Sequence, residues 1–119
     1  MVLVDTSIWV SHFRNGEPRL KELLLNGRVV CHPFIIGELA CGQLKNRKEI
    51  LSLLEALPMA KIAEHEEVLH FIEKHRLIGI GLGYVDAHLL ASALLSGIPL
   101  WMKDKKLKEV AIRLNISYR

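Results

Sequence analysis

The sequence has little cysteine and no long apolar run, and each shortage excludes a class of protein. Only two of the 119 residues are cysteines, Cys31 and Cys41, and they form neither a C-x-x-C pair nor a disulfide framework. The longest apolar stretch, Leu89 to Leu95, is broken by Ser92 and falls far short of the roughly 20 residues that span a bilayer. We therefore expect a cytoplasmic protein without a membrane span that folds without covalent cross-links.

The chain also lacks linkers, repeats and the start that a secretion signal requires. No basic segment precedes the first apolar residues, and Asp5 comes too early for the apolar core of a signal peptide. No low-complexity segment divides the chain, and 119 residues are enough for one core but not for two. We expect a single domain that covers residues 1–119.

Short apolar segments alternate with helical patterns along the chain. Five segments have the composition of strands: residues 1–4, 29–31, 60–63, 100–102 and 116–118. Their apolar runs are continuous, which is typical of a parallel sheet covered on both faces. Helical periodicity or helix start and stop signals mark six further segments: 18–26, 33–41, 47–56, 64–76, 84–95 and one after Asp104. The alternation predicts an α/β sandwich with a parallel sheet.

Four carboxylates stand at the edges of these apolar segments. Asp5 ends the first predicted strand, and Asp104 follows the fourth. Glu38 interrupts an apolar helix, and Asp86 lies near the start of a helix rich in Leu and Ala. Carboxylates are rarely buried unless they are paired or metal-bound, and sites in open parallel sheets form beyond the carboxyl ends of the strands. We predict that the four acids meet at one cation site.

The chemistry of such a site suits phosphodiester hydrolysis. Carboxylate oxygens are the preferred ligands of Mg²⁺ and Mn²⁺, and a metal-bound water is a nucleophile at neutral pH. Thr6 and Ser7, next to Asp5, are placed to hold a metal-bound water or a phosphate oxygen. Four lysines surround Asp104 and favour a polyanionic substrate, although each also fits a solvated helix face: Lys103, Lys105, Lys106 and Lys108. The first three are the predicted contacts.

Most of the acids also have a structural explanation. Asp5 and Asp104 are suited to cap the helices that follow them, and Asp86 in a first turn favours the helix dipole. Glu38 has no such role, because it lies in the middle of a helix among apolar residues. His88 is not expected to share a metal with Asp86, since residues i and i+2 of a helix point about 200° apart.

Four sequence blocks, taken together, resemble those of PIN domains, and more narrowly those of the VapC-type toxins of bacterial and archaeal toxin–antitoxin pairs. The blocks follow the family's order over nearly the whole chain: Asp5-Thr6-Ser7-Ile8-Trp9, Ile36-Gly37-Glu38-Leu39, Tyr84-Val85-Asp86-Ala87-His88-Leu89-Leu90-Ala91-Ser92-Ala93 and Leu100-Trp101-Met102-Lys103-Asp104-Lys105-Lys106-Leu107.

The resemblance implies a three-layer α/β/α fold with a five-stranded parallel sheet and Mg²⁺- or Mn²⁺-dependent endoribonuclease activity. It makes four acids the metal-binding and catalytic residues, with Thr6 or Ser7 as the supporting hydroxyl: Asp5, Glu38, Asp86 and Asp104. It also implies three partners, which are RNA, a second copy of the chain and a small antitoxin. The antitoxin is expected to insert a C-terminal segment, often with an Arg, into the acidic groove.

Two other functions remain open on sequence alone. A regulatory or binding module of PIN-like or flavodoxin-like shape would use Asp5, Asp86 and Asp104 as a phospho-acceptor or structural Mg²⁺ site. Such a module would assign no role to Glu38. A PIN scaffold without nuclease activity would serve only in assembly. Hydrolysis of RNA distinguishes both from the nuclease.

Overall fold

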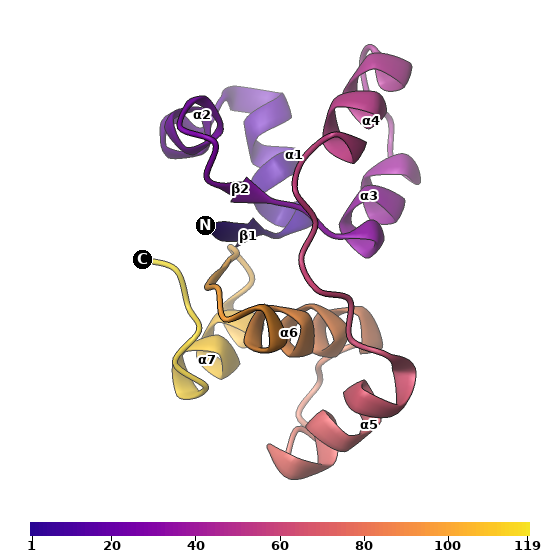
Figure 1. Cartoon of the computed structure of the whole chain (residues 1–119), viewed down its shortest axis with the longest axis vertical. Coiled ribbons are helices and arrows are strands. Elements are labelled where there is room, and N and C mark those ends of the chain that lie inside the picture. Colours follow the sequence, from indigo (N-terminus) through magenta and orange to yellow (C-terminus); the bar gives the residue numbers. More distant parts are fainter.

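The computed structural model describes residues 1–119, and a short parallel sheet lies at its centre (Figure 1). Strand β1 (Val2–Val4) lies between β2 (Val29–Val30) and β3 (Leu100–Trp101), and both neighbours run parallel to it. All three residues of β1 are buried. Because β1 is the middle strand, its carboxyl end delivers Asp5 to the centre of one edge of the sheet.

Seven helices surround this sheet: α1 (Thr6–Asn15), α2 (Pro18–Leu25), α3 (Pro33–Ala40), α4 (Arg47–Glu55), α5 (His65–Lys74), α6 (Tyr84–Ser96) and α7 (Lys105–Arg113). Figure 1 shows α1 and α2 on one side of the strands and α6 and α7 on the other. The six predicted helices are present, with ends within two residues of those expected. Helix α1 is the one whose bounds the sequence pattern did not give. None of the helices combines the length and the apolar character of a membrane span.

The prediction of a five-stranded sheet was wrong, because the sheet has three strands. Segments 60–63 and 116–118 lie at the two outer edges, where the pairing consists of one isolated parallel bridge on each side. The bridges join Cys31 to Met59 and Leu100 to Ser117. On the second edge, β3 is only two residues long and offers little backbone for a longer ladder.

Segment 60–63 does not continue as a strand, because its neighbour β2 ends just before α3 begins at Pro33. The Ala60 N–H still donates to the carbonyl oxygen of Cys31, at 2.9 Å. The N–H groups of alternate residues face the same neighbour, so those of Lys61 and Ala63 face away from β2. The Lys61 N–H donates to Ser96 Oγ at 2.8 Å, and the Ala63 N–H donates to Ser92 Oγ at 3.2 Å. The serine hydroxyls of α6 thus satisfy the outer edge of this segment.

The hydroxyl of Ser92 is fully buried and joins three segments of the core. His32 Nδ1 accepts the Phe34 N–H at 3.0 Å, so Nε2 carries the proton and donates to Ser92 Oγ at 3.1 Å. The Ala63 N–H also donates to Ser92 Oγ. The Ser92 hydroxyl hydrogen is then available for His88 Nδ1, 3.4 Å away. The start of α3, the segment before α5 and the middle of α6 are thereby tied together.

Replacing Ser92 tests this tie. Ser92→Ala leaves the Ala63 N–H and His32 Nε2–H buried without an acceptor, at a cost of about 1–3 kcal/mol for each such group. We expect the free energy of unfolding in urea to fall by about 3 kcal/mol. Ser96→Ala is the matched control, because Ser96 accepts from the same segment but is only half-buried. Equal losses for the two variants would contradict a special role for Ser92.

Candidate functional site

Asp5 is held at the end of β1 by contacts that join two strand ends. Its side chain is 7% exposed and caps α1, with Oδ2 accepting from Ser7 N at 3.2 Å and Ser7 Oγ at 2.7 Å. Ser7 Oγ accepts in turn from the Lys103 N–H at 3.1 Å. The Asp5 N–H donates to the carbonyl oxygen of Trp101 at 2.9 Å. These bonds fix the carboxylate relative to the segment that carries Asp104.

Glu38 reaches the start of α1 from helix α3. Its Oε1 accepts from the Thr6 hydroxyl at 2.7 Å, so the two hydroxyls predicted as supporting residues each bond an acid of the predicted site. Ile35 and Leu39 turn into the core, whereas Glu38 itself is exposed. The apolar neighbours of Glu38 in the sequence therefore reflect the buried face of α3 and not burial of the carboxylate.

Asp86 shows that the four carboxylates lie within electrostatic reach of one another. It is half-buried in the first turn of α6. Burial raises its pKa, and the negative charges of Asp5, Asp104 and Glu38 raise it further. A hydrogen bond from the Gly83 backbone acts in the opposite direction. Four acids that are far apart in the sequence are therefore neighbours in the fold.

The expected capping role of Asp5 and Asp104 is confirmed, and it leaves room for a second role. Asp104 caps α7, where its Oδ2 accepts from the Leu107 N–H at 3.3 Å. Both caps use Oδ2, and no hydrogen bond within the chain reaches Oδ1 of either residue. Capping orients each carboxylate and keeps one oxygen free, so capping and cation binding are compatible.

The donor set fits a hydrated hard cation. No three side chains of His, Cys, Asp or Glu converge as a preformed metal centre, so the four acids do not meet at one point in this structure. Mg²⁺ keeps several of its waters and is usually bound through one or two carboxylates, which suits this looser arrangement. His88 takes no part, because it is 4% exposed and its Nδ1 faces Ser92.

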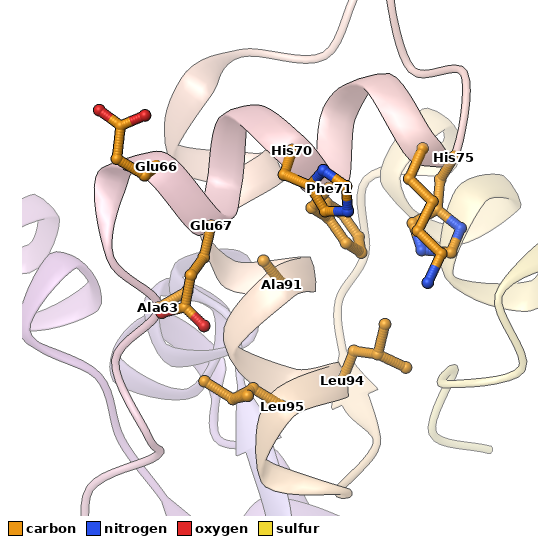
Figure 2. Close-up of a pocket in the computed structure, with 10 residues that line it drawn as sticks. Ala63, Glu66, Glu67, His70, Phe71, His75, Ala91, Leu94 and Leu95 are labelled. Atoms are coloured by element: carbon orange, nitrogen blue, oxygen red, sulfur yellow. The ribbon is translucent and has the colours of Figure 1, made fainter.

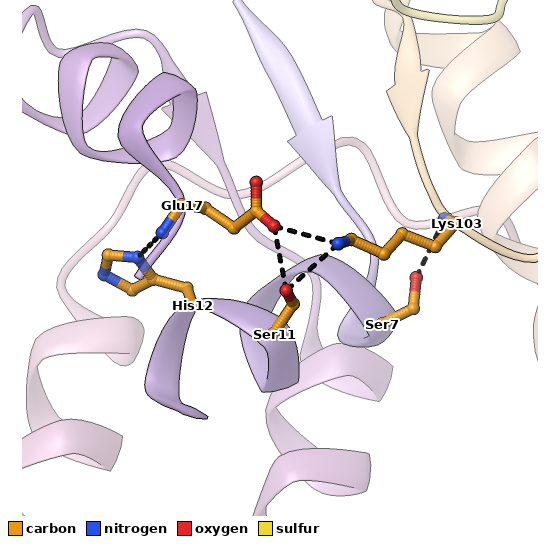
Figure 3. A network of polar contacts seen from close by, with 5 residues as sticks. All are labelled: Ser7, Ser11, His12, Glu17 and Lys103. Carbon is orange, nitrogen blue, oxygen red and sulfur yellow. Dashed lines mark hydrogen bonds and ion pairs between the residues drawn. The ribbon is translucent and has the colours of Figure 1, made fainter. Parts of the chain in front are cut away.

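The three lysines predicted to bind RNA differ in their surroundings. Lys103 Nζ forms an ion pair with Glu17 Oε1 at 2.9 Å and donates to Ser11 Oγ at 3.0 Å (Figure 3). The hydrogen bond from Lys103 lowers the pKa of Glu17, and that from Ser11 lowers it further. Lys105 and Lys106 are exposed and have no ion pair. The charges of Lys105 and Lys106 are therefore not neutralised by an ion pair, whereas Glu17 neutralises that of Lys103.

Lys106 also contacts the glycine-rich turn before α6. Gly81 has a positive φ of +89°, and a Cβ atom at this position would lie 3.3 Å from Lys106 Nζ. The turn that leads to Asp86 therefore allows close approach of the lysine from α7. This contact brings a free positive charge toward the start of α6.

Only some of the hollows in the surface are lined by an acid of the candidate site. A hollow of about 580 Å³ lies between α5 and α6 and is lined by residues such as Phe71, Leu94 and Leu95, but by none of the four acids (Figure 2). A second hollow, of about 550 Å³, is lined by Thr6 and Glu38 together with basic side chains of α1 and the segment after α3. The chemistry of the lining favours the second hollow as the approach to the candidate site.

Sequence reasoning missed His32, which positions one side of this site. His32 is fully buried and caps α3, the helix that carries Glu38, while its Nε2 bonds Ser92 of α6, the helix that carries Asp86. Its place directly before Pro33, the first residue of a predicted helix, was the signal that could have found it.

The comparisons with known proteins agree with this fold. The profile of the PIN domain family matches residues 2–113, and the chain belongs to that family. Within the family it is of the VapC type. It is 49% identical over 118 residues to Ribonuclease VapC32 of Mycobacterium tuberculosis, in strains CDC 1551 / Oshkosh and ATCC 25618 / H37Rv. That match covers 98% of this chain and 95% of the relative.

A solved structure supports the fold alone. The crystal structure of PAE2754 from Pyrobaculum aerophilum superposes with a TM-score of 0.62 and 17% sequence identity. The superposition covers 96% of this chain and 88% of the other.

The burial of His32 predicts a pH dependence of stability. Burial, and secondarily the charge of His88, lowers the pKa of His32 from 6.5 to about 4, so the native imidazole stays neutral while the unfolded one takes up a proton below pH 6.5. Stability should therefore fall as the pH drops from 6.5 toward 4, by up to about 1.4 kcal/mol per pH unit. Urea unfolding at a series of pH values measures this slope.

His32→Asn should flatten the slope in that window, since Asn also caps helices but does not titrate. His70→Asn, at an exposed position, is the control and should leave the slope unchanged. A slope that His32→Asn does not alter would contradict the assignment.

Proposed function

We propose that this protein is a divalent-metal-dependent endoribonuclease that acts as the toxin of a toxin–antitoxin pair. The observation that supports this most directly is that Asp86 lies within electrostatic reach of Asp5, Asp104 and Glu38, in a chain of the PIN family. The name of the VapC32 relative gives ribonuclease as the activity of that protein. Because 49% of residues are identical over nearly the whole chain, the same class of reaction is the best candidate for this protein.

In the proposed mechanism, four acids would hold Mg²⁺ or Mn²⁺: Asp5, Glu38, Asp86 and Asp104. When bound, such an ion would supply a nucleophilic water at neutral pH and offset charge on the phosphate. The Ser7 hydroxyl orients the Asp5 carboxylate, and the Thr6 hydroxyl orients that of Glu38. Lys105 and Lys106 attract the RNA backbone.

The proposed antitoxin would offer a basic side chain to the acids, and an apolar hollow supports a protein partner nearby. The hollow, of about 340 Å³, lies between α1, α2 and α4, and seven of its eight lining residues are hydrophobic. Trp9 lines it, and its buried indole N–H has no hydrogen-bond partner in the chain. A partner segment with apolar residues would suit this lining. On the basis of the family resemblance, we also propose that the protein forms a homodimer. Analytical ultracentrifugation would measure its mass in solution.

Cleavage of RNA should require both the metal and the acids. Purified protein with Mg²⁺ or Mn²⁺ should cleave transfer, ribosomal or messenger RNA, and a chelator should abolish the reaction. Asp5→Asn and Asp86→Asn should each lower the rate by at least about a hundredfold, since each removes a charged ligand. Folded protein that binds metal but cleaves none of these RNAs would favour the non-catalytic binding module instead.

Asp86→Asn should also stabilise the metal-free protein. It removes a carboxylate that burial and three neighbouring negative charges disfavour. We expect its Tm without metal to exceed that of the wild type, and the rise in Tm on adding Mg²⁺ to be smaller than in the wild type. Glu73→Gln, at an exposed position of α5, is the matched control and should change neither quantity. A lower Tm for metal-free Asp86→Asn would show that repulsion does not dominate there.

The surroundings of the lysines predict an unequal contribution to RNA binding. Lys105→Ala and Lys106→Ala should each weaken binding of single-stranded RNA and reduce the slope of log Kd against log salt by about one. Lys103→Ala should change that slope less, because the charge of Lys103 is offset by Glu17. Fluorescence anisotropy over a salt series measures all three. An equal change for Lys103→Ala would mean that RNA displaces Glu17.

A further inference from the structure

Four aromatic and imidazole rings from three helices form a continuous array beside the acids. Phe34 of α3 contacts His88 of α6 with ring centroids 4.3 Å apart. His88 contacts Tyr84, one turn earlier on α6, at 5.8 Å, and Tyr84 contacts His65 of α5 at 5.6 Å. We refer to Phe34, His65, Tyr84 and His88 as the ring array. The chain has only seven Phe, Trp and Tyr residues, and two of them lie in this array.

The outer rings of the array are exposed, yet they are held in place. Tyr84 is 41% exposed, and its hydroxyl lies 2.9 Å from His65 Nδ1. His65 is the first residue of α5, where a capping box of Glu64 and Glu67 fixes the start of the helix. Ordering an exposed side chain costs conformational entropy, and little burial compensates for it here. A pre-ordered exposed ring is a surface that a flat ligand can cover at a low entropic cost.

The inner part of the array is rigid. His88 is 4% exposed and its Nδ1 faces the buried Ser92 hydroxyl. Phe34 is half-buried and also contacts the His32 ring, with centroids 5.3 Å apart. The exposed rings therefore pack on side chains, those of His88 and Phe34, that the core holds in position.

The array borders the candidate site without overlapping it. Phe34 and Glu38 are four residues apart on α3, so they share one face at a separation of about 6 Å along the helix axis. Tyr84 and His88 share a face of α6, and Asp86 projects about 160–200° away from them. A ligand on the rings would therefore reach the candidate site from the side of Glu38 and leave Asp86 free.

We propose that Tyr84, with Phe34 and His65 beside it, forms a stacking surface for an unpaired nucleobase next to the phosphodiester that is cleaved. This inference rests on the proposed function, since it takes RNA as the substrate. Rings with polar edges suit bases, which stack on any aromatic face and bond at their edges. The array therefore favours single-stranded RNA, because the bases of a duplex are already stacked.

Binding of RNA with and without its bases tests the proposal. The probes are a fluorescein-labelled single-stranded oligoadenylate and the same backbone with abasic ribose in place of adenosine. Anisotropy is measured with Ca²⁺ in place of Mg²⁺, so that binding is separated from cleavage. Base stacking on aromatic side chains makes a roughly tenfold to hundredfold difference in affinity, so wild type should prefer the adenylate by about that factor.

Variants at Tyr84 then locate the preference. Tyr84→Leu should lower the ratio of the two affinities toward one, and Phe34→Leu should lower it in part. Tyr84→Phe should keep the ratio, because it keeps the ring. Tyr118→Leu is the matched control, since Tyr118 packs on Trp101 outside the array, and it should also keep the ratio. Thermal unfolding of each variant shows whether it remains folded at the assay temperature.

The outcomes separate this inference from the proposed nuclease. A wild-type ratio of one, or a ratio that Tyr84→Leu leaves unchanged, in protein that cleaves RNA with Mg²⁺ would overturn the stacking surface and leave the nuclease intact. A ratio that depends on the Tyr84 ring in protein that cleaves no RNA would support the surface and reject the nuclease. If Tyr84→Leu changes the sedimenting mass but not the ratio, the rings are a contact between copies, and the proposal is wrong.

Discussion

The buried hydroxyl of Ser92 is the contact on which both the core and the candidate site depend. It accepts hydrogen bonds from the Ala63 backbone and from His32, and it faces His88. The first bond joins segment 60–63 to α6, and the second fixes the start of α3 against the same helix. Because α3 carries Glu38 and α6 carries Asp86, one satisfied polar group in the core also sets the spacing of two carboxylates. A buried network of this kind specifies one arrangement only when all its members are paired.

The carboxylates themselves oppose this arrangement. Burial raises the pKa of Asp86, and the negative charges of the other three acids raise it further, so like charges repel at the site when no cation is present. Two of the acids are kept in place by capping hydrogen bonds, from Ser7 to Asp5 and from Leu107 to Asp104. The caps are local and form whenever α1 and α7 form. Helix starts at the strand ends therefore assemble like charges that would otherwise separate, and a divalent ion is the natural counter-charge.

Features that depend on local pattern could be predicted from the sequence, and features that depend on tertiary hydrogen bonding could not. Six helices and the positions of the four acids follow from periodicity and from runs of apolar residues. The width of the sheet does not, because it depends on where the neighbouring strands end, and β2 stops at the start of α3 while β3 is two residues long. The ion pair between Lys103 and Glu17 joins residues far apart in the sequence, so the lysine cluster gave no sign that one charge is offset. A polar residue within an apolar helix, such as Ser92, is equally consistent with exposure.

Catalysis and recognition are assigned to different parts of the fold, and the same core contact supports both. Asp5, Asp86 and Asp104 stand at strand ends or in a first helical turn, and Glu38 joins them from within α3, whereas the ring array is built from helix surfaces that meet over His88. His88 was a poor metal ligand by its spacing from Asp86, and the structure gives it a different place, beneath Tyr84 and against Ser92. His88, which the core holds in place, thus gives the exposed Tyr84 ring a rigid packing partner. Because His32, Ser92 and His88 form one chain of contacts, the distance between the acids and the rings is set inside the core and not by flexible surface loops.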